Sequence, residues 1–485
     1  MFVGTGSDVG KSVINAAFCR IFKQDDYRPA PFKAQNMSLN SYATPEGLEI
    51  GRAQAMQAEA CGIPCSVDMN PVLLKPTNHT TSQVVLNGKP AGNQSARQFF
   101  HETDRDELFR QAMAACARLM NKYNPLVIEG AGSISEVNLW NRDIANMRVA
   151  ETLNAPTYLI ADIDRGGVFA SVYGSIQLLP PEQRQLIKGI IINKFRGDIS
   201  LFDDGKVILE KLCGVPVVGV IPYFRDIYLD QEDSVVLEHQ THQDRQGQVK
   251  IAVVLLRHMS NFTDFNVLER HPEVHLYYAA RPEELKKADI ILLPGSKNTI
   301  DDLNYLRQSG MAKAVLQCHA EGKGVYGICG GYQMMGQSIL DPYGIEGNVE
   351  AIPGLGLLPV QTTLTPDKKT EACTFSFLGS EIDCAGYEIH MGETTAEHPQ
   401  PLCLTDKGEQ DGFFLNNKTF GTYLHGFFDN ARTIEYVLRQ VAHYIPADED
   451  EIMDNNTFKE LQYDKLAAHI RANVDLEYIY STITN

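Results

Sequence analysis

The first stretch whose residues could do chemistry lies close to the N-terminus, from Gly4 to Ser12, and reads GTGSDVGKS. Its glycines let the backbone turn tightly and point N–H groups inward, where they can bind phosphate oxygens. Lys11 can then reach the outer phosphates, and the Ser12 hydroxyl can ligate Mg²⁺. The stretch therefore predicts a phosphate-binding loop at a helix N-terminus, with these candidate nucleotide ligands: Gly6, Asp8, Gly10, Lys11 and Ser12.

The loop departs from the strict phosphate-loop pattern, because Thr5 stands where the first glycine belongs. The alternative is a Gly/Ser turn that happens to precede a lysine. Val13, Ala16 and Phe18 continue as an amphipathic helix, which is the context a phosphate loop needs. Only three residues precede the loop, so we expect part of the strand that feeds it to be missing from this chain.

Three predicted strands end in polar residues: Glu129, Asp162 and Asn193 each follow an apolar run. In open parallel sheets, ligands gather at the carboxyl ends of the strands. One acid in such a place is often only a helix cap. Three such strand ends beside a phosphate loop predict a shared site, in which Glu129 and Ser12 are the candidate Mg²⁺ ligands.

Lys33 follows another short apolar run, Ala30 to Phe32. A lysine at a strand end near the phosphate loop can add a second positive charge to the nucleotide site. The alternative is a solvated surface lysine. The residues alone leave both interpretations open.

The second stretch able to do chemistry is GICGG, which places Cys329 between glycines after an apolar strand and before a helix. Small neighbours allow the strained turn that exposes a nucleophile at a helix N-terminus, and the helix end favours the thiolate. The backbone N–H groups of Gly330 and Gly295 are the candidate oxyanion hole. His425 is the candidate base, and His390 is either a rival base or a wall of the site.

Strands alternate with helices in both halves of the chain, which predicts an α/β fold built on a doubly wound parallel sheet. A polar stretch without apolar periodicity separates the halves. We therefore predict a nucleotide-binding domain over 1–235, a linker over 236–249, a second α/β domain over 250–435, and a helical extension over 436–485 that packs against the second domain.

Composition narrows the function classes. The net charge of −18 argues against nucleic acid or an anionic membrane as the main partner. The apolar runs are too short to span a bilayer, and we see no signal peptide. Ten scattered cysteines form no disulfide framework or zinc-site spacing, so a cytoplasmic location is expected.

Taken together, these motifs resemble the glutamine-hydrolysing cobyric acid synthases of cobalamin biosynthesis, in the CobB/CobQ family. The resemblance runs nearly end to end. Beyond the phosphate loop and the cysteine elbow, the telling stretches include the segments at 32–41, 142–147, 162–169 and 386–392. The most specific parts of these are residues 35–37, QNM, and residues 164–169, DRGGVF.

The resemblance implies a dethiobiotin synthetase-like phosphate-loop domain followed by a class I glutamine amidotransferase-like domain. Such enzymes use ATP, Mg²⁺ and glutamine to amidate the b, d, e and g carboxylates of adenosylcobyrinic acid a,c-diamide. By similarity, Cys329 attacks glutamine, His425 moves protons, and the first domain forms an acyl phosphate with help from Lys33. Asn193 matches the position that contacts adenine in dethiobiotin synthetase, although Arg196 stands where an aspartate is usual.

The implied partners are therefore the corrinoid, glutamine and ATP. The cobalt belongs to the substrate, and no metal cofactor of the protein's own is expected. Many amidotransferases carry an acid two residues after the histidine, but here that residue is Phe427, and the nearest acid is Asp429. The group that orients the His425 ring and the oligomeric state both stay open.

Two other functions remain possible on sequence grounds. One is another ATP-dependent amidase of the same design, such as a cobyrinic acid a,c-diamide synthase or an amidase of a cell-wall precursor. The other is a ParA-like ATPase switch, which only the first half supports. The cysteine elbow argues against a switch.

Overall fold

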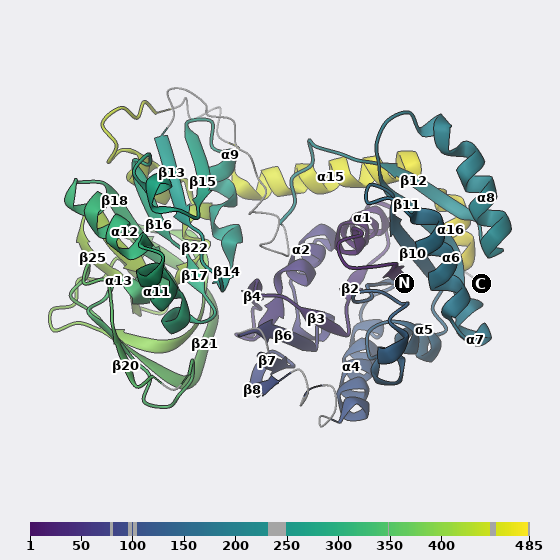
Figure 1. Ribbon diagram of the computed structural model, residues 1–485, viewed down its shortest axis with the longest axis horizontal. Helices are drawn as coiled ribbons and strands as arrows, with labels where there is room; N and C mark the ends of the chain where they lie inside the picture. The colour runs from purple at the N-terminus through teal and green to yellow at the C-terminus, as the bar shows by residue number, and fades with distance from the viewer. Residues whose placement is uncertain are drawn as a thin grey trace.

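The computed structural model describes residues 1–77, 81–95, 99, 104–230, 249–347, 349–446 and 453–483. Residues 236–248 of the predicted linker, 236–249, lie outside the described residues. The two halves of the chain form separate α/β units that lie side by side, the first in purple and blue and the second in green (Figure 1).

A parallel sheet forms the centre of the first half. Its order is β2, β9, β1, β10, β11 and β12, where Glu129, directly after β9, bridges to Phe2 of β1. The strands are β1 (Phe2–Gly4), β2 (Ala30–Phe32), β9 (Leu126–Ile128), β10 (Thr157–Asp162), β11 (Ile187–Phe195) and β12 (Val217–Pro222). The carboxyl ends of β1, β9, β10 and β11 carry the predicted site residues to one edge of this sheet.

Both faces of this sheet are buried, because alternate residues of each strand face opposite sides. Tyr158 and Ile160 of β10 pack into one hydrophobic cluster, whereas Leu159 and Ala161 pack into the other. The covering helices are α1 (Lys11–Gln24), α2 (Arg52–Cys61), α4 (Arg105–Met120), α5 (Met147–Leu153), α6 (Val168–Leu178), α7 (Pro181–Arg184) and α8 (Asp203–Cys213). This doubly wound architecture confirms the predicted α/β fold.

Smaller strands extend the first half toward the second. They are β3 (Gln35–Met37), β4 (Ser41–Ala43), β5 (Glu49–Gly51), β6 (Val72–Pro76), β7 (Thr81–Leu86) and β8 (Lys89–Ser95). They pair as a four-stranded sheet, β3-β6-β7-β8, and a two-stranded ladder, β4-β5. Short 3₁₀ turns complete this half: η1 (Val67–Met69), η2 (Val137–Arg142) and η3 (Ile199–Phe202).

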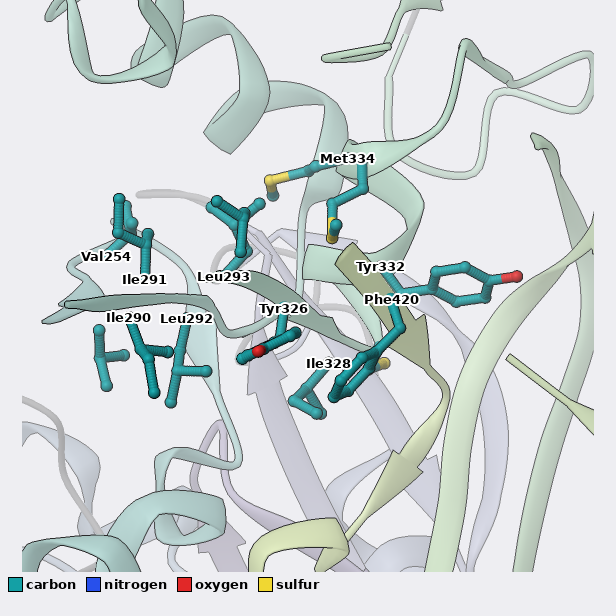
Figure 2. Close-up of a cluster of buried hydrophobic side chains, with 14 of the residues drawn as sticks. Val254, Ile290, Ile291, Leu292, Leu293, Tyr326, Ile328, Tyr332, Met334 and Phe420 are labelled. Carbon is teal, nitrogen blue, oxygen red and sulfur yellow. The ribbon is translucent and has the colours of Figure 1, made fainter. Parts of the chain in front are cut away.

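A six-stranded sheet forms the core of the second half, in the order β15-β13-β16-β18-β26-β25. Its strands are β13 (Val249–Val254), β15 (Val274–Ala279), β16 (Ile290–Leu293), β18 (Gly324–Ile328), β25 (Phe413–Asn416) and β26 (Thr419–Thr422). Figure 2 shows Ile290 and Leu292 on one side of β16 and Ile291 and Leu293 on the other. Both faces are therefore apolar, as in a sheet covered on both sides.

Short elements and helices surround this sheet. They are β14 (Met259–Ser260), η5 (Phe262–Phe265), α9 (Asn266–Arg270), α10 (Pro282–Leu285), β17 (Gly295–Ser296), α11 (Thr299–Gln308), α12 (Met311–Ala320), α13 (Gly330–Met335), η6 (Phe427–Asp429) and α14 (Ala431–Leu438). Because α14 runs through residue 435, the predicted end of the second domain falls inside this helix.

A second, largely antiparallel sheet in this half was not predicted. It consists of β19 (Ser338–Leu340), β20 (Ala351–Pro353), β21 (Gln361–Phe377), β22 (Ile382–Thr395), β23 (Cys403–Thr405), β24 (Gln410–Asp411) and β27 (Leu424–His425). Much of β21 is exposed or half-buried, so it lacks the apolar run that marked the central strands. This sheet matters because β27 carries His425.

The prediction that the C-terminal extension packs against the second domain was wrong. Helices α15 (Asn455–Asn473) and α16 (Leu476–Ile483) bury Leu466, Ile470 and Ile479 in the hydrophobic cluster of α1 in the first half. Arg20 of α1 also donates to Asp464 (Nε to Oδ1, 2.7 Å). Figure 1 shows α15 crossing from beside α9 to β12. The extension thus covers an apolar face of α1.

No helix among the described residues is long and apolar enough to cross a membrane.

The packing of α15 leads to a stability prediction. Leu466 is fully buried, whereas Leu461 on the same helix is 41% exposed. Leu466→Ala should lower the free energy of unfolding of the first half by about 2–5 kcal/mol, since it leaves a cavity. The matched control Leu461→Ala should stay within about 0.5 kcal/mol. Urea unfolding followed by the fluorescence of Trp140, the only tryptophan, reports on this half. Equal effects of the two variants would contradict the packing.

Candidate active sites in the two halves

The predicted phosphate loop leads from β1 into α1. Gly10 has φ 97°, and a Cβ there would come within 2.2 Å of Asn193 Nδ2, so this turn requires glycine. Lys11 Nζ donates to the carbonyl oxygens of Gly6 (2.8 Å) and Gly132 (3.0 Å). The N-cap residue of α1 is Gly10, which has no side chain to cap the helix, and a helix N-terminus of this kind is a natural anion site.

Glu129 is the centre of the site in the first half. It is fully buried, and its Oε1 accepts hydrogen bonds from Ser12 Oγ (2.7 Å) and Lys33 Nζ (2.8 Å). Its Oε2 accepts one from Gln57 Nε2 (2.7 Å). Burial alone raises the pKa of Glu129, but the Lys33 charge and these hydrogen bonds outweigh it and lower the pKa. Lys33 is itself buried, so the surface-lysine alternative is wrong.

The other predicted residues of this site brace the loop. Asn193 Nδ2 donates to the carbonyl oxygen of Val9 (2.8 Å), and Lys194 Nζ bridges Asp8 O and Asp162 Oδ2 (2.5 and 2.9 Å). The Asp8 side chain is exposed beside Arg165, with 3.3 Å between Arg165 Nη2 and Asp8 Oδ2. The structure thus brings the three predicted strand ends to the phosphate loop.

The donor set of Ser12 and Glu129 fits Mg²⁺. A hydroxyl and an ionised carboxylate are hard oxygen donors, which Mg²⁺ prefers. Their oxygens lie 2.7 Å apart beside Lys11 and the first turn of α1, where phosphate would bind.

In the second half, Cys329 occupies the predicted elbow between β18 and α13. Its backbone is in a strained conformation, with φ 51° and ψ −110°. A Cβ on Gly327 would lie 2.7 Å from Tyr332 N, and one on Gly331 only 2.0 Å from Leu293 O. The flanking glycines are therefore required by close backbone approach.

The His425 ring is oriented by Asp264, a residue that sequence reasoning missed. Asp264 Oδ2 lies 2.7 Å from His425 Nδ1, and Oδ1 accepts from Gly426 N at 2.9 Å. Burial lowers the pKa of His425, but the charges of Asp264 and Cys329 outweigh it and raise the pKa to about 10. His425 can therefore stay protonated beside Cys329, as a thiolate–imidazolium pair requires.

Asp264 comes 161 residues before His425, so no local spacing signals their contact. The sequence left the orienting group open, because the residue two positions after the histidine is Phe427 and the nearest acid is Asp429. Asp264 reaches the ring because η5 packs against η6, just after β27, and that is a property of the fold.

His390 forms a wall of the site. Its ring stacks on Tyr423 at a centroid distance of 3.7 Å, and its Nδ1 lies 3.1 Å from the carbonyl oxygen of Gly392. The Cys329 charge contributes to the raised pKa of the other predicted histidine, His425.

The two predicted oxyanion-hole residues also lie at this site. A Cβ on Gly330 would come within 2.7 Å of Ser296 N, so the backbone after Cys329 meets the β17 segment closely. Gly295 pairs with Ser260 in the β14–β17 ladder, and a Cβ there would lie 3.3 Å from His425 Cε1.

A cavity of about 250 Å³ opens above Cys329 at the boundary of the two halves. Lys75, Thr77 and Thr81 of the first half line it, together with these residues of the second half: Ser260, Asn261, Ser296, Lys297, Asn298, Thr299, Cys329, Gln333, Gly344, Ile345, Glu346, Gly347, Lys368, Ile389, His390 and Met391. Charged groups of both signs thus face a space next to the thiol.

Burial shifts the titration of two of these groups. It lowers the pKa of Lys297 to about 8, with a further contribution from the Lys75 charge. It raises the pKa of Glu346 to about 7, although Glu346 Oε2 accepts a hydrogen bond from Ile300 N (2.9 Å).

These two sites define a class of protein: a phosphate-loop nucleotide-binding unit joined to an amidotransferase unit that carries a buried cysteine in a strained elbow. Comparison with known proteins agrees. Residues 1–235 match the model of the CobQ/CobB/MinD/ParA nucleotide binding domain, and residues 250–433 match the CobB/CobQ-like glutamine amidotransferase domain.

Full-length relatives narrow the class to one family. The chain is 58% identical to the cobyric acid synthases of Bacteroides fragilis and Phocaeicola vulgatus, covering 100% of this chain and 98% of each relative. It is 45% identical to that of Streptococcus sanguinis with the same coverage. The chain belongs to the cobyric acid synthase family, as the sequence motifs predicted, and it is an enzyme.

The Asp264–His425 pair predicts the reactivity of Cys329. Asp264→Asn removes the charge that favours the imidazolium, so the pKa of His425 falls and the thiolate is less populated. Alkylation of Cys329 by iodoacetamide at pH 7, followed by peptide mass spectrometry, should slow by about tenfold or more. Asp429→Asn is the matched control and should have little effect. A larger effect at Asp429 would overturn the assignment.

Proposed function

We propose that the protein uses ATP and glutamine to amidate the b, d, e and g carboxylates of adenosylcobyrinic acid a,c-diamide, giving adenosylcobyric acid. The observation that carries the proposal is that the Asp264–His425 pair beside Cys329 and the Ser12–Glu129 pair at the phosphate loop coexist in a chain similar end to end to cobyric acid synthases. A ParA-like switch would need only the phosphate site.

Glutamine hydrolysis would take place in the second half. Cys329 Sγ attacks the side-chain amide carbon of glutamine, and N–H groups of Gly330 and of the Gly295–Ser296 segment stabilise the oxyanion. His425 gives its proton to the leaving nitrogen, so ammonia departs and a thioester remains. Water then attacks the thioester with His425 as base, releasing glutamate and the thiol.

The amino acid part of glutamine carries one ammonium and one carboxylate. Glu346 and Lys297 line the cavity beside Cys329 and have the complementary charges. We assign them to these two groups, with Ile300 N holding the Glu346 carboxylate in place.

Carboxylate activation would take place in the first half. A carboxylate is a poor electrophile, so the γ-phosphoryl group of ATP is first transferred to it, giving an acyl phosphate and ADP. Ammonia attacks the acyl carbon, a proton is lost and phosphate leaves. Lys11 and Lys33 neutralise charge on the phosphoryl group, while Gly6, Asp8 and Gly10 shape the loop.

Ser12 and Glu129 would hold Mg²⁺, which supplies charge neutralisation for the phosphates when bound. Asn193 braces the phosphate loop through its hydrogen bond to the carbonyl oxygen of Val9 and would lie near the bound nucleotide. All ten cysteines are free, which agrees with the proposed cytoplasmic location.

Mass spectrometry tests the overall reaction. Adenosylcobyrinic acid a,c-diamide incubated with the protein, ATP, Mg²⁺ and glutamine should lose about one mass unit four times, as each OH is replaced by NH₂ after activation through phosphate. An unchanged corrinoid would show that the acceptor, or the whole assignment, is wrong.

Two variants separate the half-reactions. Cys329→Ala should abolish amidation with glutamine but retain it with ammonium chloride, because only the nitrogen source is lost. Lys11→Ala should abolish amidation with either nitrogen source, because the phosphoryl group is no longer stabilised. Amidation by Cys329→Ala with glutamine as the only nitrogen source would show that Cys329 is not the nucleophile.

The charges beside Cys329 predict a bell-shaped pH profile of kcat/KM for glutamine. Below a pH of about 7, Glu346 is protonated and cannot pair with the ammonium; above about 8, Lys297 is neutral and cannot pair with the carboxylate. Lys297→Met should flatten the alkaline limb and raise KM by about tenfold or more. If the alkaline limb persists in this variant, Lys297 does not bind glutamine.

A further inference from the structure

The turn that carries Asp264 is held on both sides by residues of the first half. Just before η5, Asn261 Oδ1 accepts a hydrogen bond from Ser41 N at 2.9 Å. Just after it, Asn266 Nδ2 donates to Asp230 Oδ1 at 2.9 Å. The orienting acid of the cysteine site therefore sits between two contacts to the other half of the chain.

The turn depends on tertiary contacts: its four residues are buried, and Phe262 and Phe265 pack in the core of the second half. η5 is a single 3₁₀ turn of four residues, closed by a bond from Asp264 N to Asn261 O (3.1 Å). Such short turns have poor hydrogen-bond geometry and depend on their surroundings. Asn261 is also in the left-handed region, with φ 52°, which tertiary contacts must maintain.

Asp230 is in turn fixed by Arg52, the first residue of α2. Arg52 Nε donates to Asp230 Oδ2 at 2.9 Å, and its Nη2 also pairs with this oxygen. Burial raises the pKa of Asp230, but the Arg52 charge outweighs it and lowers the pKa, so this pair stays ionised. Arg52 is itself buried, so the pair is a rigid support for Asn266.

The same arginine reaches His425 by a second path. Arg52 lies over the Tyr42 ring (4.8 Å), Tyr42 packs on Tyr387 (4.6 Å between centroids), and Tyr387 stacks on His425 (5.3 Å). One face of the His425 imidazole therefore stacks on Tyr387, which packs against Tyr42 of the first half, while its Nδ1 faces Asp264.

We infer that Asn266, through Asp230 and Arg52, is a positioning residue for the Asp264–His425 pair, so that the nucleotide-binding half completes the cysteine site. This inference rests on the proposed hydrolysis of glutamine at Cys329. The residues act on the orientation of the His425 ring and do not touch glutamine.

The test is steady-state glutamine hydrolysis by the full-length Asn266→Ala variant. Asn266 is outside the set of described residues that line the Cys329 cavity, so KM should stay within about twofold. Because a small misplacement of a catalytic group is costly, kcat should fall by about tenfold or more. A purely structural defect would instead lower the amount of folded protein. It would leave kcat unchanged when kcat is calculated per active site, with the active sites counted by alkylation of Cys329 in a separate sample.

Arg270→Met is the matched control. Arg270 ends the same helix, α9, and also contacts the extension on the first half, through Asn455 Oδ1 (2.8 Å) and the Phe458 ring. Its hydrogen bond goes to Asn455 of the extension, away from the Asp264–His425 pair, so its kcat should stay within about twofold of the parent enzyme.

A second variant covers the case in which Asn266→Ala does not fold. Asn261→Gly keeps the left-handed backbone, which glycine adopts readily, but removes the amide that accepts from Ser41 N. Its kcat should also fall. If both variants keep the parent kcat, or change no more than Arg270→Met, the inference is wrong. If the parent enzyme does not hydrolyse glutamine, the proposed function fails instead.

Discussion

The arrangement of the two halves depends on one buried carboxylate, Glu49. It is fully buried, and it needs positive charge on both of its oxygens to remain ionised there. Lys75 of the first half supplies one ammonium (Nζ to Oε1, 2.7 Å), and Lys368 of the second half pairs with the other oxygen. Burial raises the pKa of Glu49, yet the charges of Lys368 and Lys75 outweigh it and lower the pKa. Separating the halves would leave this charge incompletely paired.

The two lysines that pair with Glu49 also reach the Cys329 site. Lys75 and Lys368 also line the cavity above Cys329, and Lys75 Nζ donates to Ser41 Oγ (2.7 Å), next to the backbone N–H that holds Asn261. On the other side, α2 carries Arg52 toward the cysteine site and Gln57 toward Glu129. One short helix thus contacts the supports of both sites, which explains how a single docked arrangement can serve two chemistries.

The features of this enzyme that depend on local backbone conformation could be predicted from the sequence. The phosphate loop and the Cys329 elbow are each set by glycines at fixed spacing, and the central strands by apolar runs. Asp264 was missed because its contact with His425 spans 161 residues. The placement of α15 was wrong because an apolar helix face does not specify which apolar surface covers it. The long strands β21 and β22 were missed because half-exposed strands lack a continuous apolar run.

We propose that nitrogen released at Cys329 ends in an amide made at the phosphate site. The direct measurement is to supply glutamine labelled with ¹⁵N at its side-chain amide, together with ATP, Mg²⁺ and adenosylcobyrinic acid a,c-diamide, and to determine the isotope content of the product. Every new amide should then carry ¹⁵N. Labelled ammonia that accumulates while the corrinoid stays unamidated, or a product whose new amides are unlabelled, would contradict it.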